Sequence, residues 1–110
     1  MERPVKGDVV VVPFPFSDLT RTKRRPALVV AVLEGDDRIL CQITSRMVRD
    51  SYAMRLESAD FQDGELRQSS NIRPNRLFTA DTRLILYRVG RLTQRKMNEA
   101  TEAVARIVRG

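Results

Sequence analysis

The apolar residues of this 110-residue chain fall into short runs that end at proline, glycine or clustered acidic residues, and this spacing restricts most of the chain to short β-strands. The β-branched run DVVVV follows Gly7 and ends near Pro13 and Pro15, which cannot donate ladder hydrogen bonds. The segments PALVVAV (26–32) and RILCQITS (38–45) flank the turn EGDD, and this arrangement predicts a β-hairpin.

Further short strands are expected along the rest of the chain. One is YAMRLE (52–57), a second is SNIRPNRLFTAD (70–81), interrupted at Pro74, and the last is LILYRVGRL (84–92). The polar residues 17–25 have no period and predict a loop, and the acidic stretch SADFQDGEL predicts turns.

From Thr93 onward the apolar period becomes that of an α-helix. Thr93 is the expected N-cap and Gly110 the end of this helix. Five or six short strands followed by one helix predict a mainly β fold of one domain, residues 1–110: a small, strongly bent antiparallel sheet or partial barrel with a C-terminal amphipathic helix packed on it. The expected apolar face of the helix consists of Met97, Ala100, Val104, Ile107 and Val108.

The composition excludes several classes of protein. The chain has no histidine, and Cys41 is its single cysteine, so neither a disulfide framework nor a structural zinc site is expected. Cys41 alternates with Ile39 and Ile43 and is therefore expected in the core. No apolar run is long enough for a membrane span or a signal peptide. We expect a cytoplasmic protein without metal or cofactor.

The positive charge is concentrated at the two ends of the chain. The formal net charge is +6; residues 1–31 and 67–110 are strongly basic, whereas residues 32–66 are acidic. Basic ends that converge in space would attract an anionic partner, and the excess of arginine over lysine favours bidentate contact with phosphate. The simpler alternative is that the charge only keeps the protein in solution.

A basic cluster at the start of a strand is the first candidate site. Lys23, Arg24 and Arg25 precede Pro26, which restricts Arg25 to an extended backbone. If the predicted hairpin forms, Thr44 falls at the same end as Arg25, and a hydroxyl beside a guanidinium makes a compact oxyanion site. The alternatives are a solvated cap that protects the sheet edge, and a threonine placed by β-propensity alone.

Several motifs in this order resemble the PemK/MazF family of toxin endoribonucleases from bacterial toxin–antitoxin pairs. The resembling segments KGDVVVVPFPFSDL, KRRPALVVAV, CQITSR, SSNIRPNRLFTAD and VGRLTQRKMNEATEAV cover nearly the whole chain. The most specific parts are the pairs Gly7-Asp8, Arg25-Pro26 and Ile43-Thr44.

The resemblance implies an SH3-like, PemK/CcdB-like barrel with an added helix, a homodimer, and metal-independent cleavage of single-stranded RNA. It matches Arg25 to a catalytic arginine and Thr44 to a catalytic threonine. In this chemistry the RNA 2′-hydroxyl attacks the adjacent phosphorus and leaves a 2′,3′-cyclic phosphate and a 5′-hydroxyl. A histidine is not required, because Arg25 and the Thr44 hydroxyl can stabilise the charge that develops on the phosphorane.

The resemblance also supplies a candidate general base. Asp81 matches an aspartate of some relatives, whereas their neighbouring arginine corresponds here to Phe78. A plain turn residue is the alternative for Asp81, and Asp18 is a second candidate base. Predicted RNA contacts are the basic or polar residues Lys23, Arg24, Ser45, Arg46, Arg49, Arg73 and Arg76, with Phe14 and Phe16 as stacking partners.

The expected partners are single-stranded RNA and a cognate acidic antitoxin, whose disordered segment would compete with RNA for the basic groove. Contact with operator DNA is expected only as a complex with that antitoxin. Two other functions stay open at this point. One is a non-cleaving toxin of the same fold that poisons gyrase, and the other is a catalytically degenerate member that only binds RNA.

Overall fold

The computed structural model describes residues 3–15 and 22–110. They form one antiparallel sheet of seven strands in the order β4-β6-β3-β2-β1-β7-β5, followed by one α-helix. The elements are β1 (Asp8–Pro15), β2 (Thr22–Val32), β3 (Asp37–Thr44), β4 (Met54–Leu56), the 3-10 helix η1 (Ser58–Asp60), β5 (Phe61–Gly64), β6 (Ser70–Asp81), the 3-10 helix η2 (Thr82–Leu84), β7 (Tyr87–Leu92) and α1 (Gln94–Arg109).

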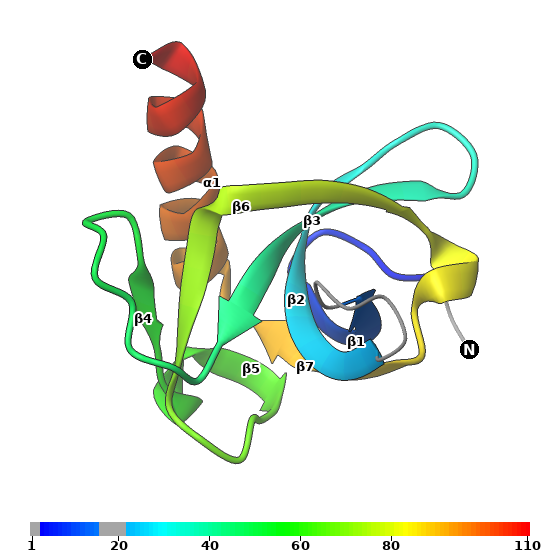
Figure 1. The fold of residues 1–110 in the computed structure, drawn as a ribbon, viewed down its shortest axis with the longest axis horizontal. Helices are drawn as coiled ribbons and strands as arrows, with labels where there is room; N and C mark the ends of the chain where they lie inside the picture. Colours follow the sequence, from blue (N-terminus) through cyan, green and yellow to red (C-terminus); the bar gives the residue numbers. More distant parts are fainter. Residues whose placement is uncertain (1–2, 16–21) are drawn as a thin grey trace.

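The sheet is strongly curled (Figure 1). Its two edge strands, β4 and β5, are consecutive in the sequence and are joined by residues 57–60 only. So short a connection requires that the two edges of the sheet approach each other, and the sheet therefore forms a half-barrel. The predicted class, a mainly β fold with a bent antiparallel sheet and a C-terminal helix, is confirmed.

Successive side chains of a strand point to opposite faces of a sheet, and each face here carries its own apolar cluster. The helix-side cluster packs beneath α1 and consists of Val9, Leu28, Cys41, Ile43, Leu56, Ile72, Leu92, Met97 and Ala100. The second cluster, on the other face, consists of Val10, Val12, Ala27, Val29, Leu40, Ala80 and Ile85, with Phe14 and Phe78 packed against it.

The C-terminal helix begins as predicted. Thr93 is its N-cap, and the Thr93 hydroxyl oxygen accepts a hydrogen bond from Lys96 N at 3.2 Å. Met97 and Ala100 are buried in the helix-side cluster. The prediction that Val108 also belongs to the buried face is wrong: its side chain is 73% exposed, because the last turn of α1 extends beyond the sheet (Figure 1).

Two segments predicted as loop or turns contain strands. β2 begins at Thr22, which pairs with Pro15 of β1, so Lys23, Arg24 and Arg25 lie within the strand. The acidic stretch after β4 contains η1 and β5, and β5 pairs with β7. There Gly64 and Gly90 bring the backbones close: a Cβ on Gly90 would lie 2.4 Å from the carbonyl oxygen of Asp63.

The interruption of β6 at Pro74 is visible in its register with β3. Arg73 pairs with Gln42, whereas Leu77 pairs with Cys41, so residues 74–76 bulge out of the ladder. No helix among the described residues is long and apolar enough to cross a membrane.

A buried carboxylate ties the start of β1 to β7. The side chain of Asp8 is 3% exposed; it accepts hydrogen bonds from Val5 N at 2.9 Å, Arg88 Nε at 3.1 Å and Arg91 Nε at 3.0 Å. Arg88 also bridges to the exposed Asp63. Asp8 is the buried acceptor that all three of these donors share, so it is the member of this network on which stability depends most.

We therefore expect Asp8→Asn to lower the free energy of unfolding by about 1.5–3 kcal/mol. The matched control Asp63→Asn removes an exposed partner of the same Arg88 and should cost less than about 1 kcal/mol. Urea unfolding of both variants at one protein concentration measures the two losses. Equal losses would contradict the role assigned to Asp8.

Candidate active site

The antiparallel pairing of β2 with β3 positions the two leading site residues. Ala27 pairs with Gln42, and the same register continued by two residues brings Arg25 opposite Thr44. On the other side of β3, Gln42 pairs with Arg73 of β6. Side chains two residues apart share a face, so these groups continue the face that carries the second cluster.

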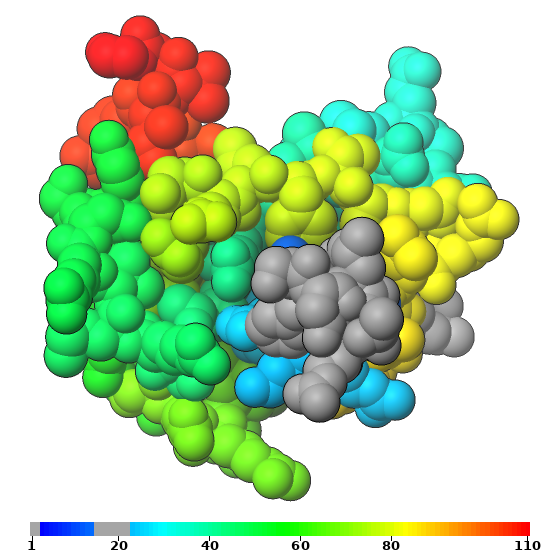
Figure 2. Space-filling model, in the orientation of Figure 1, coloured from blue at the N-terminus to red at the C-terminus, as the bar shows by residue number. Residues whose placement is uncertain are grey.

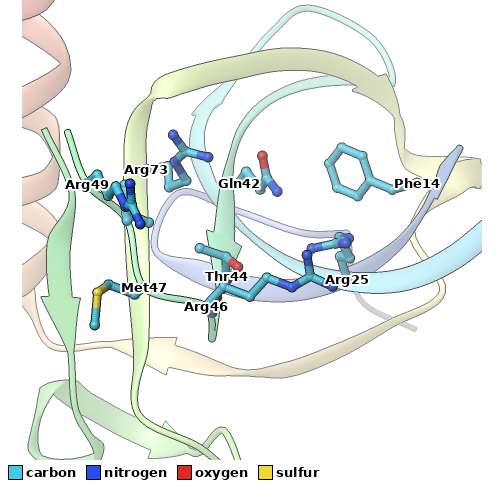
Figure 3. A pocket seen from close by; sticks show the side chains of 9 residues that line it. Phe14, Arg25, Gln42, Thr44, Arg46, Met47, Arg49 and Arg73 are labelled. Carbon is cyan, nitrogen blue, oxygen red and sulfur yellow. Dashed lines mark hydrogen bonds between the residues drawn. The ribbon is translucent and has the colours of Figure 1, made fainter. Parts of the chain in front are cut away.

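The side chains at this end of the face surround a pocket of about 390 Å³ (Figure 3). Arg25, Gln42, Thr44 and Arg73 contribute to its wall, and Phe14 of β1 closes one side. A neighbouring groove of about 650 Å³ shares Arg25, Thr44 and Arg46 with the pocket, so the two hollows form one continuous surface. Figure 2 shows this side of the molecule, with the green segment after β3 and the yellow-green β6 along the hollow.

A local hydrogen bond orients the side chain of Thr44. The residue is only 6% exposed, and its hydroxyl oxygen accepts a hydrogen bond from Arg46 N at 3.1 Å. A hydroxyl group that accepts in this way can still donate its proton, and Thr44 lines the pocket. The half-buried Arg25 comes from the strand next to it. Guanidinium and hydroxyl together form a donor pair suited to a phosphate oxygen.

The pocket is strongly positive. Arg25, Arg46, Arg49 and Arg73 line it, and no carboxylate is among the lining residues that the structure describes. Asp50 lies just behind the wall, where Arg73 Nη2 donates to it at 2.9 Å. Partial desolvation acts to raise the pKa of Asp50, but hydrogen bonds from Tyr52 N and Arg73 outweigh it and hold that pKa below its ordinary value.

The structure brings most of the predicted site residues to this surface. Arg25 and Thr44 line both hollows. Arg76 lies in the bulge of β6, is exposed, and lines neither hollow. Phe16 and Asp18 lie outside the described residues. The remaining predicted contacts are divided between the pocket (Phe14, Arg49, Arg73), the groove (Lys23, Arg24, Ser45) and both (Arg46).

Asp81 is not brought to this surface. It pairs with Asp37 at the opposite end of β3, roughly 23 Å along the strand from Thr44. There Asp81 caps η2: its carboxylate accepts hydrogen bonds from the side chain and the backbone N of Arg83, which hold its pKa below its ordinary value. This position corresponds to the structural alternative for Asp81, so we leave this residue out of the proposed catalytic group.

Gln42 and Arg67 are among the lining residues that the sequence analysis did not single out. Gln42 stands two positions before Thr44 and therefore on the same face of β3, a signal that the strand period already contained. Arg67 lies between β5 and β6 and lines the groove. Arg67 lines the groove only because the curl of the sheet brings the β5–β6 connection close to β2 and β3, and no local sequence pattern indicates this.

The comparisons with known proteins agree with the fold. A family model described as a PemK-like, MazF-like toxin of type II toxin–antitoxin systems matches residues 5–108. The chain therefore belongs to this toxin family, and the resemblance seen in the sequence is confirmed. The comparison with curated proteins finds no match.

Solved structures share the fold at low sequence identity. MazF (Form-I) from Deinococcus radiodurans is 19% identical, with 100% of both chains covered and a TM-score of 0.76. The MazE-MazF structure (Form-III) from the same organism is 18% identical, with 97% of both chains covered and a TM-score of 0.77. An endoribonuclease in complex with its cognate antitoxin from a mycobacterial species is 15% identical, with 96% of this chain and 94% of that chain covered and a TM-score of 0.75.

The ion pair behind the pocket wall gives a test of the site geometry. In Arg73→Gln the pKa of Asp50 should rise, because the carboxylate loses the partner that favours its charged form. The pKa of Asp50 in the folded protein lies below its ordinary value. The Arg73–Asp50 pair therefore stabilises the fold at neutral pH, and this contribution is lost as the pH falls through that pKa. Carboxyl-carbon NMR titration measures the change.

The control for this titration is Arg55→Gln, which removes a comparable arginine from its pair with Glu57 and should leave Asp50 unaffected. An Asp50 pKa that stays the same in Arg73→Gln would show that the two side chains do not interact in solution.

Proposed function

We propose that this chain is a metal-independent endoribonuclease, the toxin of a toxin–antitoxin pair, which cleaves single-stranded RNA and thereby inhibits translation and growth. The observation that carries the proposal is that Arg25 and Thr44, on the neighbouring strands β2 and β3, line one pocket. Family membership and the shared fold with proteins described as endoribonucleases support it.

The pocket suits an internal nucleophile. The 2′-hydroxyl attacks the adjacent phosphorus, a bond to phosphorus forms, and the bond to the 5′-oxygen breaks. The products are a 2′,3′-cyclic phosphate and a 5′-hydroxyl end, so neither water nor a metal supplies the attacking oxygen. The 2′-hydroxyl loses its proton and the departing 5′-oxygen gains one.

Arg25 and Thr44 act on the phosphoryl oxygens in this scheme. Charge accumulates on these oxygens as the five-coordinate phosphorane forms, and donors already in place stabilise it without reorganisation. The role of Arg25 in this scheme is electrostatic rather than proton transfer. Arg46 and the groove residues Lys23, Arg24 and Arg67 hold the neighbouring phosphates and align the strand.

The same surface suits the proposed partner. An acidic, partly disordered antitoxin segment would lie over the basic groove and exclude RNA by occupying it. One solved structure that shares the fold is an endoribonuclease in complex with its cognate antitoxin, and another is the MazE-MazF structure. We further propose that the toxin acts in the cytoplasm as a homodimer, and that it contacts operator DNA only as a complex with the antitoxin.

Cleavage without metal is the direct test. Purified protein incubated with a long single-stranded RNA in EDTA should give fragments with 5′-hydroxyl ends, which polynucleotide kinase labels without prior phosphatase treatment. Intact RNA with retained binding would overturn the proposal in favour of a binding member. Intact RNA together with inhibited gyrase supercoiling would favour a gyrase poison.

Substitution separates the two proposed catalytic residues from the fold. Arg25→Ala and Thr44→Val should each lower the cleavage rate by about 10²- to 10³-fold, because each removes one donor to the phosphoryl oxygens. Thr44→Ser keeps the hydroxyl and should retain much more activity than Thr44→Val.

The matched control is Arg95→Ala, which removes an exposed arginine from the first turn of α1 and should cleave at the wild-type rate. Circular dichroism and thermal melting verify the fold of every variant. Full cleavage by Arg25→Ala would show that the site is assigned to the wrong residues.

A further inference from the structure

One end of the pocket carries polar groups that the proposed phosphate chemistry does not use. Gln42 of β3 lies between Phe14 and Arg73 on the wall away from Arg25 and Thr44 (Figure 3). The side chain of Gln42 makes no hydrogen bond to another described residue. Nε of Arg73 is buried and has no hydrogen-bond partner in the described part of the chain.

A buried donor without an acceptor is unfavourable, and native proteins keep few of them. Arg73 cannot easily turn away to satisfy its Nε, because its Nη2 is bonded to Asp50 at 2.9 Å and its side chain is only 18% exposed. Asp50 is therefore a positioning residue that fixes the guanidinium. The same side chain lines the pocket, so a ligand there that presents an acceptor can bond to the guanidinium of Arg73.

The wall opposite Arg73 indicates what kind of ligand this is. The Phe14 ring is held edge-to-face against Phe78, with ring centroids 5.0 Å apart and an angle of 74°, so it forms a fixed aromatic side of the pocket. The amide of Gln42 offers a donor and an acceptor together, as the edge of a nucleobase requires. An aromatic surface combined with such an amide is typical of recognition of a single-stranded base rather than of a phosphate.

The spacing matches a base next to the reacting phosphate. Gln42 and Thr44 are two residues apart on one face of β3, roughly 7 Å along the strand, so one nucleotide can reach both. The pocket volume of about 390 Å³ falls within the range of small-molecule sites.

We infer that Gln42 and Arg73 form a base-reading subsite that sets the preferred nucleobase at one position beside the cleaved bond. Gln42 reads the hydrogen-bonding edge, Arg73 donates to an acceptor of the same base, and Phe14 packs against the ring. The inference rests on the proposed endoribonuclease function, which it extends from cleavage to sequence selection.

The test compares base preferences. Wild-type protein and the variants Gln42→Leu and Gln42→Glu each cleave a randomised single-stranded RNA pool, and the 5′-hydroxyl ends are sequenced. Gln42→Leu should reduce the preference at one position by about 5- to 150-fold, while preferences at other positions remain. Gln42→Glu has the same shape but only accepts hydrogen bonds, so it should shift the preference at that position toward bases with an exocyclic amino group.

Gln62→Leu is the matched control, since it changes an exposed glutamine of β5 and should keep the wild-type preferences. Wild-type cleavage whose preferences are unchanged in both Gln42 variants, or the absence of any preference, would overturn the inference and leave the proposed function intact.

If wild-type protein leaves the RNA intact, the same comparison uses selection of bound sequences from a randomised 2′-deoxy oligonucleotide pool, which cannot be cleaved by this chemistry. A base preference that changes in the Gln42 variants would then support the subsite although the proposed cleavage had failed. An unchanged selection would overturn both.

Discussion

The register between β2 and β3 is the constraint on which the site depends. Cys41 and Ile43 must point into the helix-side cluster, and Gln42 and Thr44, which alternate with them, therefore point to the other face. A shift of one residue would bury Thr44 among apolar side chains and expose Ile43. Packing against α1 on one face of the sheet thus fixes the geometry of the candidate site on the opposite face. Arg25 and Thr44 line the same pocket because the core on the far side of their strands permits one register only.

The second face of the sheet has an apolar end, which packs into the core, and a polar end, which lines the pocket. Apolar side chains such as Leu40 and Ala80 fill one end, where Ile85, the residue that follows η2, packs with them. Phe14 and Phe78 pack edge-to-face at the boundary, and beyond them the residues become polar. Phe78 occupies the position where the family resemblance places an arginine in some relatives. Here its ring holds Phe14 as a wall of the pocket, so β6 contributes packing at that position and its charged contribution comes from Arg73.

The parts of this structure that were predicted correctly are those that local sequence patterns indicate. The hairpin and the capped helix follow from turn residues and apolar period, and the Arg25–Thr44 pair follows from the hairpin. β5 was missed because its pairing with β7 depends on two glycines far apart in the sequence, Gly64 and Gly90. Asp81 matched a motif by order along the chain, but the length of β6 carries it to the opposite end of β3. Order in sequence does not give position along a long strand.

The charge of the pocket would act on both proposed partners, the RNA substrate and the acidic antitoxin. Arg73 is neutralised by Asp50, whereas the exposed Arg46 and Arg49 form no ion pair with another described residue. Their mutual repulsion is tolerable because solvent and salt screen exposed charges. An anionic chain that enters the hollow relieves this repulsion, and the relief is the same whether phosphates or carboxylates bring the charge. If both bind here as proposed, RNA and an acidic antitoxin segment would draw on the same electrostatic free energy, and binding of one at the arginines would exclude the other.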